Sequence, residues 1–107
     1  MNGSLLEELD PIIHERVRLG ILVLLSIHRK LDFNALKKSL NVTDGNLSQH
    51  LRKLEDGSYI EVEKTFVRRR PKTIYSLSPS GREKLTLYLE KLEKILKEVK
   101  EHGKRIG

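Results

Sequence analysis

The stretch VTDGNLSQHLRKLEDGSY, residues 42–59, contains the clearest structural signals in the chain. Thr43 is a good N-cap, the acid after it suits the positive end of a helix dipole, and Gly57 suits a helix end. Between these signals, three leucines recur at i, i+4 and i+7 and form one narrow apolar stripe: Leu47, Leu51 and Leu54. The spacing therefore predicts an amphipathic helix over residues 43–56.

The polar face of this predicted helix is chemically suited to reading DNA. Each residue of a helix is rotated by about 100° from the one before it. When the leucines face inward, Gln49 therefore points outward. Gly45 leaves room for the backbone to approach a groove. Asn and Gln can pair with adenine in the major groove, and Arg and Lys can pair with guanine. The outer face and its edges carry Asn46, Ser48, Gln49, His50, Arg52 and Lys53.

The residues just before this helix predict a second, shorter one. The segment LDFNALKKSLN, residues 31–41, suggests a brief strand at 31–33 and a short helix over 34–41 capped by Asn34. A short helix, the four-residue turn NVTD and an amphipathic helix together form a helix-turn-helix arrangement. In that arrangement the second helix lies in the DNA major groove.

The residues after the amphipathic helix predict a β-hairpin over 59–77 with a cationic tip. YIEVEKTF and TIYSL both alternate with period two, and the segment between them contains RRRPK. We expect Pro71 to restrict the turn. Adjacent guanidinium groups repel one another, and this repulsion is relieved when phosphates lie against them. A solvated turn without a partner would have a similar sequence. As a wing beside the reading helix, the hairpin would contact DNA through Arg68, Arg69, Arg70 and Lys72.

Long helices are predicted at both ends of this region. In DPIIHERVRLGILVLL, Asp10 fits an N-cap and Pro11 a first helical residue, which predicts a helix over 10–30. Ser78 and Pro79 open a second helix over 78–102 in the same way. At 1.5 Å per residue that helix is roughly 35–40 Å long, more than a domain of this size needs internally.

The apolar residues of the two ends predict a homodimer. The leucine-rich stripe of the C-terminal helix and the leucine cluster near the N-terminus both lack cover within so small a domain. Burying four or five such side chains contributes on the order of 8–12 kcal/mol gross. The expected dimer interface contains Leu5, Leu6, Leu9, Leu89, Leu92, Leu96 and Val99.

The composition limits the classes of function. The 107 residues predict a single domain, 1–107, and a net charge of +6 favours an anionic partner. The absence of cysteine excludes disulfides and thiolate metal sites, and the four histidines do not cluster in sequence, so we expect no metal and no cofactor. We see no phosphate-binding loop or nucleophile motif and expect no enzyme.

The longest apolar run, 21–27, is too short to span a membrane and no signal peptide is evident, which predicts a cytoplasmic protein.

Two segments also resemble a known family. TDGNLSQHLRKLEDGSYIEVEKTF, followed by RRRPKTIYSLSPSGREKL, is similar to winged-helix transcriptional regulators of the MarR and ArsR type. It is most similar to their small one-domain members, over roughly residues 10–100. The resemblance implies a mainly α fold with a small β-hairpin, in which the helix over 43–56 enters the major groove, the wing contacts flanking DNA, and the terminal helices form the dimer.

The sequence therefore favours a homodimeric regulator of transcription that binds a palindromic site in double-stranded DNA. The alternative is a winged-helix module that binds protein or RNA without operator specificity, because a fold does not fix a function. Metal sensing by histidines across a dimer and the identity of a small-molecule effector are left open by the sequence.

Overall fold

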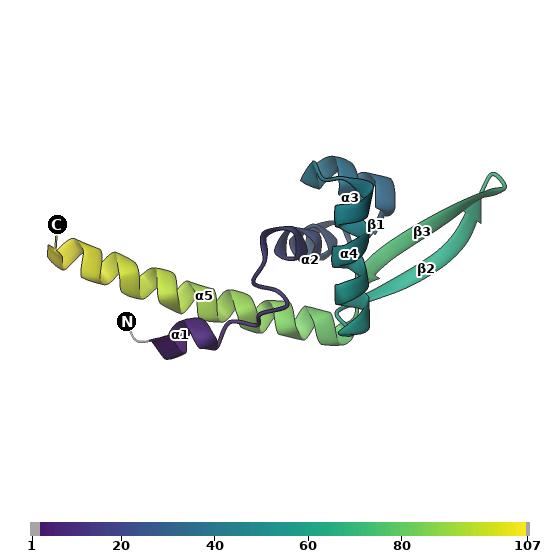
Figure 1. The fold of residues 1–107 in the computed structure, drawn as a ribbon. Helices are drawn as coiled ribbons and strands as arrows, with labels where there is room; N and C mark the ends of the chain where they lie inside the picture. The colour runs from purple at the N-terminus through teal and green to yellow at the C-terminus, as the bar shows by residue number, and fades with distance from the viewer. Residues whose placement is uncertain (1–2, 107) are drawn as a thin grey trace.

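The computed structural model describes residues 3–106 of the chain, with side chains for residues 5–103. Figure 1 shows a helical head, a hairpin that projects from one side and a long helix that extends from the other. The molecule is accordingly elongated, with extents of 61 × 25 × 22 Å. The elements in chain order are α1 (Gly3–Glu7), α2 (Arg16–His28), β1 (Lys30–Asp32), α3 (Phe33–Leu40), α4 (Asp44–Asp56), β2 (Ile60–Val67), β3 (Arg70–Leu77) and α5 (Pro79–Ile106).

The strands form one antiparallel sheet in the order β1-β3-β2. Strands β2 and β3 are the predicted hairpin, paired from Ile60 opposite Leu77 out to Val67 opposite Arg70. The short strand β1 joins the other side of β3, with Asp32 opposite Ile74. The mainly helical fold with a small hairpin, predicted from sequence, is confirmed.

The core joins α2, α4, the base of the hairpin and the first half of α5. The leucine stripe of α4 is buried, which confirms the predicted inner face of that helix. Opposite it, α2 contributes Ile21, Leu22 and Leu25, and α5 contributes Leu85 and Tyr88, all of them buried. Because α4 is held along its full apolar stripe, its outer face has a fixed orientation.

Three of the predicted helix ends are confirmed. The Thr43 hydroxyl accepts a hydrogen bond from the Asn46 N–H at 3.1 Å and caps α4. The Ser78 hydroxyl accepts from the Gly81 N–H at 2.8 Å and caps α5, with Pro79 as its first residue. Helix α3 ends at Asn41, whose backbone is left-handed with φ 54°. These caps were predictable because each is satisfied by residues within one turn of the helix end.

Two predicted N-caps are wrong. Asp10 caps an isolated turn, in which its carboxylate accepts the Ile12 N–H at 2.8 Å, and its other oxygen accepts the Tyr59 hydroxyl hydrogen bond at 2.6 Å. This turn does not continue into α2, which begins at Arg16, after the N-cap Glu15. Helix α3 is capped by Asp32, not Asn34, since the Asp32 carboxylate at the end of β1 accepts the Ala35 N–H at 2.8 Å.

Gly57 closes α4 for a different reason from the predicted one. Its φ is −85°, and the left-handed residue after the helix is Ser58, with φ 64°. A Cβ at position 57 would lie 2.7 Å from the Tyr59 ring, so glycine is required by close packing. Helix α5 also runs past the predicted end at 102, to Ile106.

Gly81 provides a test of how tightly α5 is seated. A Cβ there would lie 1.8 Å from the Tyr59 carbonyl oxygen, whereas a Cβ at Gly103 of the same helix would meet open space. We expect Gly81→Ala to lower the free energy of unfolding by about 3 kcal/mol or more, and Gly103→Ala to leave it unchanged or raise it by up to about 1 kcal/mol. Urea unfolding followed by circular dichroism measures both, and equal stability of the two variants would contradict this packing.

Candidate nucleic-acid interface

The outer face of α4 carries most of the predicted reading residues. Five of the six side chains predicted there are exposed: Asn46, Ser48, Gln49, Arg52 and Lys53. Gly45 is also exposed, and a Cβ at that position would meet no atom of the described chain within 4 Å. The structure thus gathers amide, hydroxyl and cationic groups on one accessible helix face with an open N-terminal turn.

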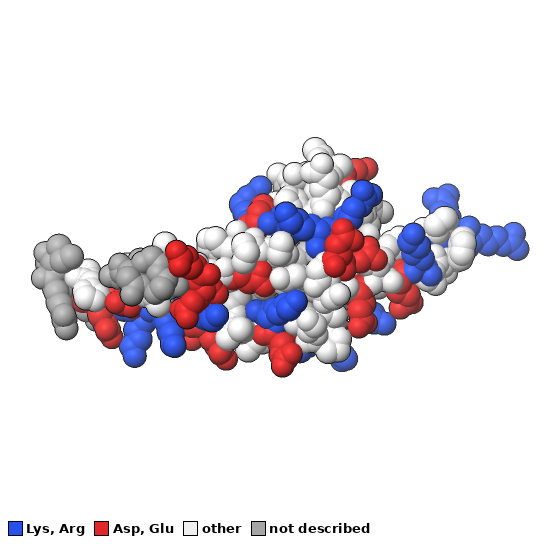
Figure 2. Space-filling model, turned by 60° about the horizontal axis from the view of Figure 1, so that its bottom comes forward, with Lys and Arg blue, Asp and Glu red and all other residues white. Residues whose placement is uncertain are grey.

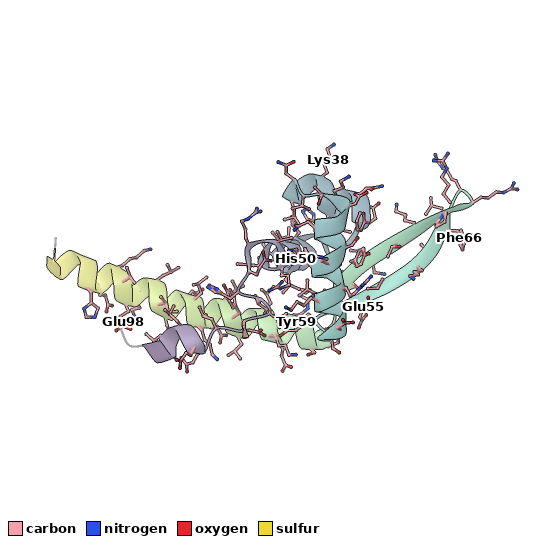
Figure 3. All side chains as sticks on the ribbon, viewed as in Figure 1. Lys38, His50, Glu55, Tyr59, Phe66 and Glu98 are labelled. Carbon is pink, nitrogen blue, oxygen red and sulfur yellow. The ribbon has the colours of Figure 1, made fainter. Side chains whose placement is uncertain are left out.

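His50 does not belong to this face. Its side chain is 16% exposed, and its Nδ1 lies 3.0 Å from a guanidinium nitrogen of Arg18 in α2. The helical wheel places position 50 beside the leucine stripe, where α2 covers it (Figure 3). Because a guanidinium only donates, Nδ1 accepts this hydrogen bond and carries no proton. The expected recognition role of His50 is therefore replaced by a contact between helices.

Arg18 is the centre of the network that holds α4 against α2. It is buried, and its guanidinium also donates to the Ile12 carbonyl. The Glu15 carboxylate accepts the Arg18 backbone N–H at 2.8 Å. Burial raises the pKa of Glu15, but the N–H groups of Arg18 and Val17 and the charge of Arg18 outweigh this effect, so the pKa is lowered overall. The ionised Glu15 thus balances the buried guanidinium of Arg18 beside α4.

The helix-turn-helix is also fixed from the α3 side. Lys37 of α3 pairs with Asp44 in the first turn of α4, with the ammonium nitrogen 2.8 Å from the carboxylate. Both side chains are accessible to solvent, so the pair contributes at most about 1 kcal/mol. It spans the turn between the helices and helps set where the N-terminus of α4 begins.

The wing has an unusual turn at its tip. Arg68 and Arg69 form the two-residue loop between β2 and β3, with φ 52° and 67°. Two-residue hairpin loops with both residues left-handed strongly favour Asn-Gly. A side chain other than glycine in this conformation costs roughly 1–2 kcal/mol. Both residues of the loop carry this backbone strain, and the loop places two guanidinium groups at the outermost point of the hairpin.

The other predicted wing residues lie below the tip. Arg70 is the first residue of β3, and Pro71, expected in the turn, pairs with Phe66 inside the hairpin because the loop needs only two residues. Lys72 pairs with Asp32 at 3.3 Å. The N–H of Ala35 is the main cause of the lowered pKa of Asp32; burial opposes it and Lys72 adds to it. The structure therefore places Lys72 against the α3 cap rather than at the tip.

Figure 2 shows how charge is distributed on one face of the molecule. Basic side chains gather at the far end of the wing, whereas acidic and basic side chains mix along α5. Acidic residues of β2 lie nearer the base, where Glu63 faces Lys30 at 3.9 Å. On this face, the positive charge at the end of the wing thus coincides with the strained turn.

The apolar residues predicted for a dimer interface divide into three groups. Leu9 is 4% exposed in the core of a single chain, so it is not available to a partner. Leu5 and Leu92 are half-buried against that core. Four side chains are exposed as expected: Leu6, Leu89, Leu96 and Val99.

Two structural residues were missed by the sequence predictions. Tyr59 is buried, and it connects α4, the hairpin, α5 and Asp10, although its position directly after the helix end was visible in the sequence. Arg18 stands between Val17 and Leu19, at the start of the long apolar part of its helix, and a charge among apolar residues is a signal for a buried pair. Among the described helices, none has an apolar stretch long enough to cross a bilayer. Within the same residues, no group of three His, Cys, Asp or Glu side chains could hold a metal ion.

The helix-turn-helix, the exposed polar face of α4 and the cationic hairpin define a winged-helix DNA-binding protein. The model of the winged helix DNA-binding domain family matches residues 17–96, and the chain belongs to this family. The uncharacterized protein MJ0432 of Methanocaldococcus jannaschii is 38% identical over 88 residues, which cover 82% of this chain and 96% of that protein.

Solved structures share the fold. A transcriptional regulator homologue from Pyrococcus horikoshii OT3 is 29% identical with a TM-score of 0.81, covering 90% of this chain and 93% of that one. The protein YtfH from Salmonella typhimurium is 25% identical with a TM-score of 0.63, covering 87% and 85%. An ArsR family transcriptional regulator, at 13% identity and a TM-score of 0.56 over 91% and 95% of the two chains, is similar in fold.

Arg18 and Arg16 form a matched pair that tests the buried network. Both are arginines of the first turn of α2, but Arg18 is buried and Arg16 is exposed. Arg18→Met should lower the free energy of unfolding by about 2–3 kcal/mol, because it leaves the Ile12 carbonyl and His50 Nδ1 without their donor and removes the cation that faces Glu15. Arg16→Met should change it by less than about 0.5 kcal/mol. Chemical unfolding at one protein concentration compares them, and similar losses would contradict the network.

Proposed function

We propose that this protein regulates transcription as a homodimer that binds a palindromic operator in double-stranded DNA. The observation that carries the proposal is the pairing of two surfaces on one rigid head. The outer face of α4 offers side chains that read bases, and the hairpin beside it ends in two guanidinium groups. The regulator homologue of similar structure from Pyrococcus horikoshii OT3 supports the regulatory role.

Helix α4 reads base edges in the major groove in this proposal. Gln49 and Asn46 can pair bidentately with adenine, while Arg52 and Lys53 can donate to guanine. The open first turn at Gly45 lets the helix N-terminus, with its free N–H groups, approach a phosphate. His50 takes no part in reading and holds the helix against α2.

The wing contacts the DNA beside the reading helix. Arg68 and Arg69 reach phosphates or the adjacent minor groove, whose negative potential favours guanidinium groups. Contact with phosphates also relieves the mutual repulsion of these two side chains. This explains why the turn carries arginines at positions where the backbone favours Asn-Gly.

Dimerisation duplicates the reading head. The exposed apolar side chains of α5 lie on one stripe with the half-buried Leu92, at spacings of three and four residues: Leu89, Leu96 and Val99. Pairing of two such stripes, helped by Leu6, covers them from water. A two-fold dimer presents two α4 helices to half-sites about one helical turn, or 34 Å, apart.

Two substitutions distinguish the reading of bases from the contact with phosphates. Their binding is measured on a DNA duplex that the unchanged protein selects from a random pool. Gln49→Ala should lower discrimination at one base pair per half-site by about 1–3 kcal/mol, because a bidentate pair is lost. Arg69→Ala should weaken binding to all sequences and reduce the salt dependence by about one counterion per wing. Fluorescence anisotropy at several salt concentrations measures both effects.

Lys94→Ala is the control for the loss of charge, because Lys94 is exposed on α5 on the side away from the leucine stripe. It should leave the salt dependence nearly unchanged. Equal behaviour of the Arg69 and Lys94 variants would contradict the role of the wing. Unchanged specificity in the Gln49 variant would contradict the reading face.

Leu96 and Leu87 test the dimer surface as a matched pair. Both are leucines of α5 that are 50% exposed, but Leu87 lies on the side of the helix opposite the stripe. Leu96→Glu should convert the dimer to a monomer at micromolar concentration, because it buries a charge in the proposed interface. Leu87→Glu should remain dimeric. Sedimentation velocity gives the masses, and a monomeric unchanged protein, or equal effects of both variants, would contradict this interface.

A further inference from the structure

Phe66 of the wing is the most exposed large apolar side chain of the described residues. It is 72% exposed, and its neighbour Val67 is exposed as well. Figure 3 shows Phe66 at the far end of the hairpin, well away from the helices of the head. No part of the described chain is therefore placed to cover this ring, and its exposure needs a reason.

The fold does not require an aromatic side chain at this position. The hairpin is anchored at its base, where the pairs Ile60–Leu77 and Val62–Tyr75 pack into the core. Phe66 lies opposite Pro71, and a cross-strand contact of this kind contributes about 0.2–1 kcal/mol. A threonine or a charged residue would serve an exposed wing equally well and would lower the risk of aggregation.

The surroundings of Phe66 indicate the chemistry of its partner. Lys64 shares its face of the strand, and the three arginines that follow lie at or beside the turn: Arg68, Arg69 and Arg70. An apolar ring bordered by cations matches a surface with an apolar floor and anionic rims. The DNA minor groove is such a surface, since sugars and base edges line it and phosphates border it.

We propose that Phe66 is an apolar wedge that contacts a base step in the minor groove beside each half-site and bends the DNA there. This inference rests on the proposed binding of duplex DNA. The arginines hold the flanking phosphates, which brings the ring to the groove. Partial unstacking by apolar side chains kinks a duplex toward the major groove. The protein therefore selects flexible pyrimidine–purine steps at that position without hydrogen bonds to the bases.

The wedge and the cations have different experimental signatures. Phe66→Ala should weaken binding to the selected duplex by roughly 5-fold or more, with an unchanged salt dependence, because no charge is lost. Arg69→Ala should reduce the salt dependence instead. Phe66→Leu should keep most of the affinity, since leucine also serves as a wedge.

Energy transfer between dyes at the two ends of the duplex measures the bend. The bend should decrease in the Phe66→Ala complex and persist in the Phe66→Leu complex. Replacing the flexible step in the flank with a stiff A-tract should weaken the unchanged protein but not the alanine variant. Ile27→Ala is the control, because Ile27 is 66% exposed at the end of α2, outside the wing.

The outcomes distinguish this inference from the proposed function. If the unchanged protein binds and Phe66→Ala matches it in affinity and bend, the wedge is overturned and DNA binding stands. The wedge is also overturned, and DNA binding again stands, if the whole loss of affinity in Phe66→Ala is accounted for by a change in the salt dependence. If the unchanged protein binds no duplex at low salt, both proposals fall, and the apolar tip belongs to a protein contact. Thermal unfolding checks that each variant folds.

Discussion

The arrangement of the whole molecule depends on the packing around Tyr59. Its N–H donates to the Leu54 carbonyl at the end of α4, and its own carbonyl accepts the Ser78 N–H at the start of α5, at 3.1 Å. Its hydroxyl donates a hydrogen bond to the Asp10 carboxylate. Burial, together with this contact, raises the pKa of Tyr59. The Lys84 ammonium lies 4.4 Å from the ring centre. The end of α4, the base of the wing and the start of α5 are therefore fixed to one buried residue.

This constraint explains how a small head can present both proposed DNA-binding surfaces at once. The hairpin leaves the body directly after Tyr59, so the angle between α4 and the wing is set by the core and not by a flexible linker. The strained Arg68–Arg69 turn lies at the tip. The exposed Phe66 also lies at the far end of the hairpin, away from that core (Figure 3). Stability is thus concentrated at the base of the wing, and features suited to binding are concentrated at its end. The start of α5 is fixed at the same junction, so a dimer formed along α5 would carry both heads in a defined orientation.

Local signals were predictable from the sequence, and competition between distant groups was not. The caps at Thr43 and Ser78 and the leucine stripe of α4 depend on neighbours within a few residues, and these were predicted correctly. Asp10 was misassigned because the turn that it caps does not continue into α2, and its contact with Tyr59, 49 residues away, was not visible in the sequence. His50 was predicted at the edge of the reading face, because a helical wheel cannot show that α2 supplies Arg18 beside it. Leu9 was assigned to a dimer for the same reason, since the packing of the N-terminal segment against the core was not visible in the sequence.

The central claim is that α4 and the wing contact one duplex together, in two copies related by a two-fold axis. Hydroxyl-radical footprinting of both strands of a selected operator tests this directly, because it records every sugar that the protein covers. The account predicts two symmetric protected blocks centred about 34 Å apart, each with additional minor-groove protection on its outer side. A single asymmetric block, or two blocks without the outer protection, would contradict it.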